Sequence, residues 1–388
     1  MFILIAQASS ANNSFISFKV TANQETQLGF SVINLDLKKS TDHWQVFASP
    51  RYQTAYQDGY FDNKIMASLL DNYGLQRFLD LREIGISYNT DYLEMGLGKK
   101  IFNWEQTFEI NPVDIINPRD FTDLLDWEKI GVTGAWLKIY LSDWGTVEGA
   151  SSFFVPARLP MHKENQWFLP LPIGLILGER ILPQKTSLQN SGRLCLNIAS
   201  WDLSLFGHNG YNPFPYFALQ DSRINQIYFT QSMFGLSFAK EIWADVIFRG
   251  ETAYFIPEKK AKDDSYLQTV LSFDRLWSDE STETLHFVVQ YIREIVLKKG
   301  ENSNPNSFGR IFKNYLGTRL ESDTDRFNIQ VKNLWQIGEY DVYLQVAGKY
   351  KMLENLSLDC VIDILQGNGF FGQYDEKDRL KLVLKYLF

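Results

Sequence analysis

Histidines and carboxylates are the side chains of this chain that could support catalysis. The four histidines are His43, His162, His208 and His286. Hydrolysis needs a histidine beside a serine or aspartate nucleophile system. None of the four stands in a recognisable motif of that kind, and His208 is the best candidate. Asp359 and Asp363 share one face of a predicted strand but lie about 13 Å apart by strand rise, too far for paired-carboxylate chemistry. We therefore predict that the protein is not an enzyme.

Metal and phosphate chemistry have no better support. The two cysteines, Cys195 and Cys360, lie far apart and match no metal-binding spacing. The chain carries 38 Lys+Arg and 46 Asp+Glu residues, a net charge of −8, without a basic cluster or a glycine-rich phosphate loop. We expect no metal, no cofactor and no nucleic-acid partner.

Charged side chains recur instead at alternate positions of apolar segments. Near the C-terminus, Leu380 and Leu382 alternate with Arg379 and Lys381. The same period of two, rather than the 3.6 of a helix, dominates from Ser14 onward in segments of about ten residues. One face of each segment therefore meets an apolar environment and the other meets water. A soluble β-sandwich would share this pattern.

The connections between the segments distinguish a membrane barrel from a sandwich. We predict about eighteen strands, and their approximate ranges are 14–22, 27–37, 43–56, 77–88, 92–101, 129–141, 144–155, 192–200, 203–208, 225–239, 243–256, 265–277, 284–294, 310–321, 325–335, 340–350, 355–364 and 378–388. Tight turns alternate with mostly long loops, which is the layout of a transmembrane barrel, and sixteen strands would satisfy it as well. The sequence therefore predicts an all-β transmembrane antiparallel β-barrel with short periplasmic turns and long extracellular loops. Closure removes the unpaired edges that hydrocarbon does not tolerate.

Aromatic residues gather at the predicted tight turns. They are Trp44, Tyr88, Tyr92, Trp144, Trp201, Trp243 and Trp277. Folding would bring them into one ring, an aromatic girdle at the membrane interface. The alternative is a set of scattered core aromatics.

Strand parity predicts the residues that face the lumen. They are Glu94, Lys100, Arg249, Glu251, Lys332, Asp341, Asp359 and Asp363. Both signs of charge are present, which is consistent either with a mutually neutralising ladder or with solute selection. Arg82 in the fourth strand and Tyr315 in the fourteenth fit the alternation poorly, which suggests that a β-bulge shifts the register in these strands.

Two long loops, 102–128 and 156–191, could fold into the lumen. The first contains Asn111-Pro112-Val113-Asp114 and Asn117-Pro118-Arg119-Asp120. These motifs form either two structural turns or a constriction that presents Asp114, Arg119 and Asp120 to a solute. The second loop contains five of the 12 prolines and an apolar stretch at 168–177, and either plugs the lumen or packs on the rim.

The N-terminal residues 1–8 read as the remnant of a secretory signal peptide, because a short apolar run ends in Ala6-Gln7-Ala8. The rest, 9–388, has no linker or shift in composition, so we expect a single barrel domain.

Several stretches resemble known Gram-negative outer-membrane β-barrels. Tyr386 and the final Phe388, after alternating leucines, look like the terminal signature that the barrel-assembly machinery recognises. The stretch from Gly96 to Asp120, with its two Asn-Pro-x-Asp motifs, resembles alginate-export-like and related uncharacterised porin-like families. The resemblance implies a location in the bacterial outer membrane, in contact with outer-membrane lipid and lipopolysaccharide.

The expected function is a porin-like channel for passive diffusion or export of small polar solutes. The alternative is a closed-lumen barrel that acts as a surface-binding or assembly scaffold, with an outer-membrane hydrolase as a third class. The sequence gives no indication of the oligomeric state.

Overall fold

Alternating side chains order the chain into antiparallel strands that pair with their sequence neighbours. The computed structural model describes residues 16–21, 29–56, 79–161, 165–168, 175–184, 186–243, 245–278, 283–301 and 308–387. The strands of the main sheet are β1 (Ile16–Thr21), β2 (Gly29–Leu35), β3 (Leu37–Ser40), β4 (Trp44–Tyr56), β5 (Leu79–Asn89), β6 (Leu93–Lys100), β9 (Val132–Tyr140), β10 (Gly145–Phe153), β12 (Leu188–Ile198), β13 (Trp201–Tyr211), β16 (Thr230–Trp243), β17 (Val246–Pro257), β18 (Ser265–Ser278), β19 (Thr284–Lys298), β20 (Asn314–Asp323), β21 (Phe327–Gln336), β22 (Asp341–Leu353), β23 (Leu356–Gly367) and β24 (Arg379–Tyr386). Among the described residues, no helix is long and apolar enough to cross a membrane.

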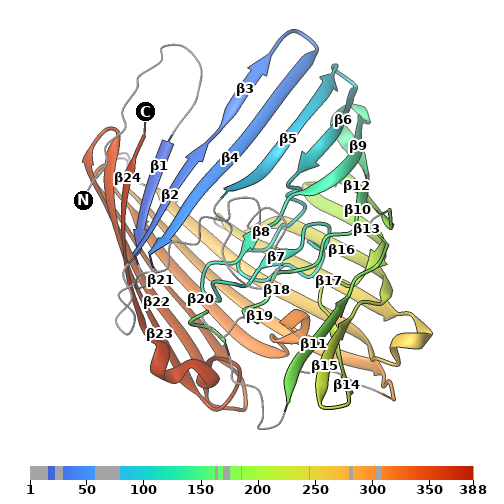
Figure 1. Cartoon of the computed structure of the whole chain (residues 1–388). Coiled ribbons are helices and arrows are strands. Elements are labelled where there is room, and N and C mark those ends of the chain that lie inside the picture. The colour runs from blue at the N-terminus through green and yellow to red at the C-terminus, as the bar shows by residue number, and fades with distance from the viewer. Residues whose placement is uncertain are drawn as a thin grey trace.

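The main sheet closes into a barrel of eighteen wall strands. It contains 19 strands. Two of them, β2 and β3, pair with β4 in one continuous register, with Asn34 opposite Arg51 and Leu37 opposite Ala48, so they form one wall strand. Each wall strand pairs antiparallel with the next, and β1 lies against β24 (Figure 1). The predicted transmembrane β-barrel with eighteen strands is confirmed.

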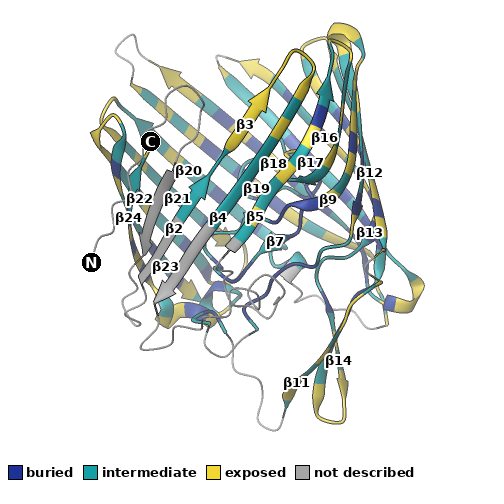
Figure 2. Cartoon of the chain, turned by 45° about the horizontal axis from the view of Figure 1, so that its top comes forward, coloured by how far each residue is buried: buried dark blue, intermediate teal, exposed yellow. Residues whose placement is uncertain are grey.

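The two faces of the wall differ as strand parity requires. On β24, Leu380 and Leu382 are each 41% exposed, whereas Arg379 and Lys381, which alternate with them, are buried. Bands of exposed and buried residues alternate along the wall strands in the same way (Figure 2). The outer face is therefore apolar and suited to lipid, and the charged side chains point into the lumen.

Two local features set the position of the strands. The register between β4 and β5 shifts at Pro50, where Ser49 pairs with Glu83 and Pro50 with Leu81, so Arg82 is bulged out as its position in the sequence suggests. The bulge predicted at Tyr315 was wrong, because Tyr315 pairs in unbroken register with Ile292 on β19 and with Gln336 on β21. On β6, a Cβ atom at Gly96 would lie 2.1 Å from the ring of Trp136 on β9. Glycine at this position allows the indole to lie over the neighbouring strand.

Short strands inside the long connections were not predicted. β7 (Arg119–Asp120) and β8 (Glu128–Lys129) pair with each other inside the barrel (Figure 1). β11 (Ile176–Ile181), β14 (Tyr216–Gln220) and β15 (Arg223–Ile227) form a separate three-stranded sheet that extends beyond the end of the barrel where the long loops lie. The strand predicted at 225–239 was wrong at its start, because 225–227 belong to β15 and the wall strand β16 begins at Thr230.

Candidate functional site

The lumen is occupied by the connection between β6 and β9, residues 101–131, which we call the inner segment. It runs inside the barrel and contains β7 and β8 (Figure 1). The side chain of Asn117 joins its two ends. Its Oδ1 accepts a hydrogen bond from the backbone N–H of Phe102 at 2.7 Å, and its Nδ2 donates to the carbonyl of Ile130 at 2.9 Å. The second Asn-Pro motif therefore fixes the fold of the inner segment rather than presenting its asparagine to a solute.

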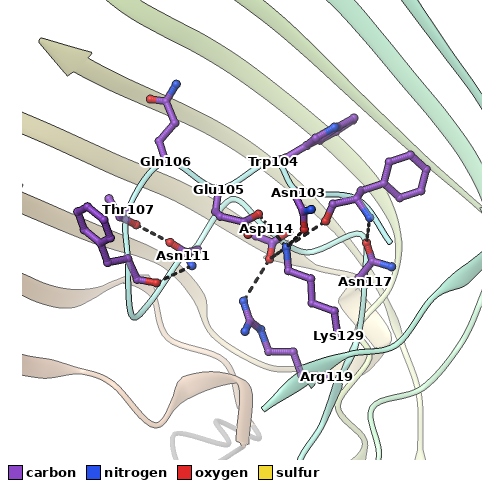
Figure 3. Close-up of polar contacts among 12 residues, drawn as sticks. Asn103, Trp104, Glu105, Gln106, Thr107, Asn111, Asp114, Asn117, Arg119 and Lys129 are labelled. Carbon is purple, nitrogen blue, oxygen red and sulfur yellow. Dashed lines mark hydrogen bonds and ion pairs between the residues drawn. The ribbon is translucent and has the colours of Figure 1, made fainter. Parts of the chain in front are cut away.

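A buried charge cluster forms the centre of the inner segment. The Asp114 carboxylate lies 2.9 Å from Lys129 Nζ and 3.1 Å from Arg119, and Lys129 also pairs with Glu105 at 2.7 Å (Figure 3). Burial raises the pKa of Asp114 above its ordinary value, against the opposing effect of Lys129 and Arg119. Asp120 is ion-paired with Arg158 at 2.6 Å. The three charges of this loop that we predicted to face a solute are thus all ion-paired: Asp114 and Arg119 pair with each other, and Asp120 pairs with Arg158.

Backbone groups of the inner segment bind polar side chains on the far wall. The buried Glu251 on β17 accepts hydrogen bonds from the N–H of Gln106 at 2.6 Å and of Thr107 at 2.8 Å. Gln290 on β19 accepts one from the N–H of Glu109 at 3.0 Å. These bonds fix the tip of the inner segment, residues 105–111, against β17 and β19.

Ion pairs connect the inner segment to three further wall strands. Glu109 lies 3.5 Å from Lys332 on β21 and 3.9 Å from Arg319 on β20. On β24, Arg379 pairs with Asp123 at 2.7 Å, and Lys381 pairs with Asp126 at 2.6 Å. The ion pairs of the tip are therefore longer than those near the end of the segment.

The remaining predicted lumen charges are held by wall contacts. Arg249 pairs with Asp274 at 2.8 Å, and Asp359 pairs with Lys385 at 2.6 Å. Asp363 is fully buried and lies 2.8 Å from Arg379.

Asp341 is also fully buried, beside the turn between β23 and β24. It accepts hydrogen bonds from the N–H groups of Gly369 and Gly372, and from the hydroxyl of Tyr315 at 2.7 Å. Its carboxylate thus fixes this turn, which includes η4 (Phe371–Lys377), rather than facing open water.

Two apolar clusters pack the inner segment against the wall. One includes Phe121 and Leu124 of the segment with Val270 and Ile292 of the wall, and the other includes Trp104 and Val113. The loop 156–191 joins the first cluster through Leu159 and Trp167. Residues 162–164, 169–174 and 185 of that loop, and with them most of its apolar stretch, lie outside the described residues.

Cavities remain on both sides of the inner segment. A cavity of about 220 Å³ lies toward the tight turns, between Phe102–Trp104 and strands β6, β9, β10 and β12. It is lined by charges of both signs: Lys100 pairs with Glu94 at 3.1 Å, and Arg193 pairs with Glu148 at 2.9 Å. A second cavity lies between the inner segment and the long loops. The lumen is therefore narrowed by the inner segment, with polar space toward the tight turns.

His208 has a serine partner that the sequence analysis missed. Its Nδ1 lies 2.8 Å from Ser191 Oγ on the neighbouring strand β12. Strand parity places both side chains on the inner face of the wall. The two residues lie on adjacent strands and are 17 positions apart in the sequence, so they form no local motif that a sequence reading could recognise. Within the described residues, no carboxylate is hydrogen-bonded to this imidazole.

The structure places the predicted aromatic girdle residues at or next to the tight turns. Trp44, Tyr92, Trp144, Trp243 and Trp277 are exposed, while Tyr88 and Trp201 are half-buried. Trp44 and Tyr88 contact each other across β4 and β5, with ring centroids 5.0 Å apart. Their interfacial role stays a prediction. Tyr386 ends β24, and Phe388 lies outside the described residues.

Sequence comparisons identify no relatives. No protein-family model matches the sequence, and no curated protein matches it either.

Solved structures share the fold at very low sequence identity. Pseudomonas aeruginosa OccD3 (OpdP) is 12% identical, with 97% of this chain and 90% of that chain covered and a TM-score of 0.52. Wzi from Escherichia coli is 8% identical, with 97% and 84% covered and a TM-score of 0.58. A BenF-like porin from Pseudomonas fluorescens Pf-5 is 9% identical, with 96% and 97% covered and a TM-score of 0.53. The chain therefore has the fold of bacterial outer-membrane β-barrels.

Proposed function

We propose that this protein is an outer-membrane channel that passes small polar solutes through a lumen narrowed by the inner segment. The observation that carries the proposal is the inner face of the wall, which presents charges of both signs around space on the turn side of the segment. A barrel of this size leaves an aqueous passage unless the chain fills it. The narrowing favours small solutes, and the paired charges favour polar ones.

The mechanism is diffusion without covalent chemistry. Solutes exchange hydrogen bonds with water for hydrogen bonds with the charged side chains of the lumen, so the polar wall lowers the cost of leaving bulk water. The Ser191–His208 pair takes no part in it.

A specific observation favours a second candidate, a closed barrel that binds ligands at the cell surface. The two apolar clusters attach the inner segment to much of the wall. Wzi, which has a similar fold, is described as a carbohydrate-binding β-barrel involved in capsule assembly.

The cellular context belongs to the same proposal. An exposed apolar outer face supports residence in the outer membrane, in contact with lipid and lipopolysaccharide, after insertion by the barrel-assembly machinery. The finer resemblance to alginate-export-like families rests on the Asn-Pro-x-Asp stretch of the inner segment.

Swelling of liposomes that contain the folded protein tests the proposed function. We expect swelling in glycine and in small monosaccharides, and a steep loss of swelling as the solutes grow, because the inner segment narrows the lumen. An absence of swelling in every small solute, with correctly folded and inserted protein, would support the closed barrel instead.

A further inference from the structure

The cavity between the inner segment and the long loops has the composition of a ligand-binding site. Its volume is about 130 Å³, so it fits one small ring rather than a chain. It is lined by the inner segment, by wall strands β16, β17 and β18, by residues 212–214, and by Gly309 and Phe312. The charged residues that line the cavity near the tight turns do not line this one.

Aromatic rings form one side of this cavity. Phe121 contacts Trp127 at 5.4 Å and Phe214 at 5.6 Å between ring centroids, and Trp127 contacts Phe312 at 5.4 Å. The indole is held in place by a hydrogen bond from its Nε1 to the carbonyl of Leu124. Trp127 and Phe214 are only partly buried by the apolar cluster around them, so each retains surface for a ligand.

Amide side chains form another part of the lining. Gln231 on β16 and Gln268 on β18 are 7% and 6% exposed. Gln268 donates from Nε2 to the carbonyl of Phe312 at 3.3 Å, while Gln231 makes no side-chain hydrogen bond to any described residue. The Gln231 amide lines the cavity, and an amide can both donate hydrogen bonds to the hydroxyl groups of a ligand and accept hydrogen bonds from them.

The charges around the cavity argue against an anionic ligand. Arg119 is the one cation among the described lining residues, and it already pairs with Asp114 at 3.1 Å. Glu109 adds a further carboxylate to the lining. A carboxylate or phosphate ligand would therefore meet no unpaired positive charge, whereas a neutral ligand avoids this cost.

We propose that this cavity is a binding site for a neutral monosaccharide, with an apolar C–H face of the sugar on Trp127 and its hydroxyl groups on Gln231 and Gln268. Rings and amides together select a molecule that is apolar on one face and hydroxylated at its edge. A sugar site would identify the class of solute that the proposed channel carries. Binding at the site does not require an open channel, and only the passage of the sugar beyond the site rests on the proposed function.

Saturation-transfer NMR on the full, detergent-folded protein tests the site with glucose, galactose, mannose and N-acetylglucosamine. We expect at least one of these sugars to bind, and glucuronate and benzoate to bind more weakly. Gln231→Leu should weaken sugar binding at least tenfold, and Trp127→Ala should do the same. Gln366→Leu, which changes an exposed glutamine on β23, should leave binding unchanged.

Two results would overturn the site. One is the absence of binding by all four sugars, and the other is binding that Gln231→Leu does not change in a variant whose folding matches that of the parent. Liposome swelling separates this failure from that of the channel. If the protein lets solutes pass but binds no sugar, the channel is supported and the sugar site is wrong. If it binds sugar but lets no solute pass, the site is supported and the channel is wrong.

Discussion

Arg379 shows how single residues hold the inner segment in the lumen. Its side chain is 3% exposed and contacts two carboxylates, Asp363 of the wall at 2.8 Å and Asp123 of the segment at 2.7 Å. A buried guanidinium between two carboxylates compensates charges that would otherwise be left without a partner away from water. The residue therefore connects the last wall strand to the content of the lumen.

Replacing Arg379 by alanine should destabilise the folded barrel strongly. The change leaves Asp123 and the fully buried Asp363 without their cation, and breaking a buried pair in this way costs about 3–5 kcal/mol. The free energy of unfolding, measured by urea titration in lipid vesicles, checks this. Lys385→Ala is the matched control on the same strand, because its side chain is 42% exposed and its pair with Asp359 should contribute below about 1 kcal/mol. Equal losses in the two variants would contradict the role of Arg379.

Replacing Glu251 by alanine should release the tip of the inner segment. Glu251 accepts hydrogen bonds from the backbone N–H groups of Gln106 and Thr107, and both groups would lose this partner. Hydrogen exchange at these two amides should become faster, by at least tenfold if about 1.4 kcal/mol of local stability is lost. Glu251→Gln keeps an accepting oxygen and should retain much of the protection. Unchanged exchange in the alanine variant would show that other contacts hold the tip.

At the scale of elements, the wall strands could be predicted and several loop strands could not. Alternation revealed β24 because Leu380 and Leu382 face lipid while Arg379 and Lys381 face the lumen. It failed at β15 because the chain passes from β15 to β16 through Tyr228-Phe229, without a glycine, proline, asparagine or aspartate to mark the turn. The alternating pattern therefore runs without a break from β15, which belongs to the three-stranded sheet, into β16, which belongs to the barrel wall.

The candidate site was less predictable than the wall for a physical reason. Parity places Glu251 on the inner face, but its partners Gln106 and Thr107 are 145 and 144 positions away. Glu109 has no strand parity at all, and its ion pairs with Lys332 and Arg319 follow from the path of the inner segment. That path depends on side-chain packing across the barrel, which no local pattern encodes.

Shortening the tip of the inner segment should widen the passage. Replacement of residues 105–111 by two glycines removes the contacts of the tip with β17 and β19 and leaves the Asn117 contacts that join the two ends of the segment. We expect a larger unit conductance than in the parent protein. Deletion of residues 220–223, at the tip of the β14–β15 hairpin, is the control and should leave conductance unchanged. A shortened tip that conducts like the parent would place the constriction elsewhere.

At the scale of the whole molecule, we expect insertion to depend on the apolar outer face and on Phe388. The outer face exposes large apolar side chains such as Phe234 and Ile329, which only a membrane or detergent covers. We expect deletion of Phe388 to lower the amount of assembled barrel in cells without changing the conductance of the molecules that do assemble. Heat-modifiable migration in gels measures assembly, and a normal amount of folded barrel would count against a terminal assembly signal.

The current across a planar lipid bilayer that contains the purified, folded protein tests the central claim most directly. Under a salt gradient, an open and narrowed lumen should give discrete current steps, and the reversal potential should report the balance of the lumen charges. Protein that is shown to be folded and inserted yet gives no steps would contradict the channel, because the inner segment would then seal the barrel rather than narrow it.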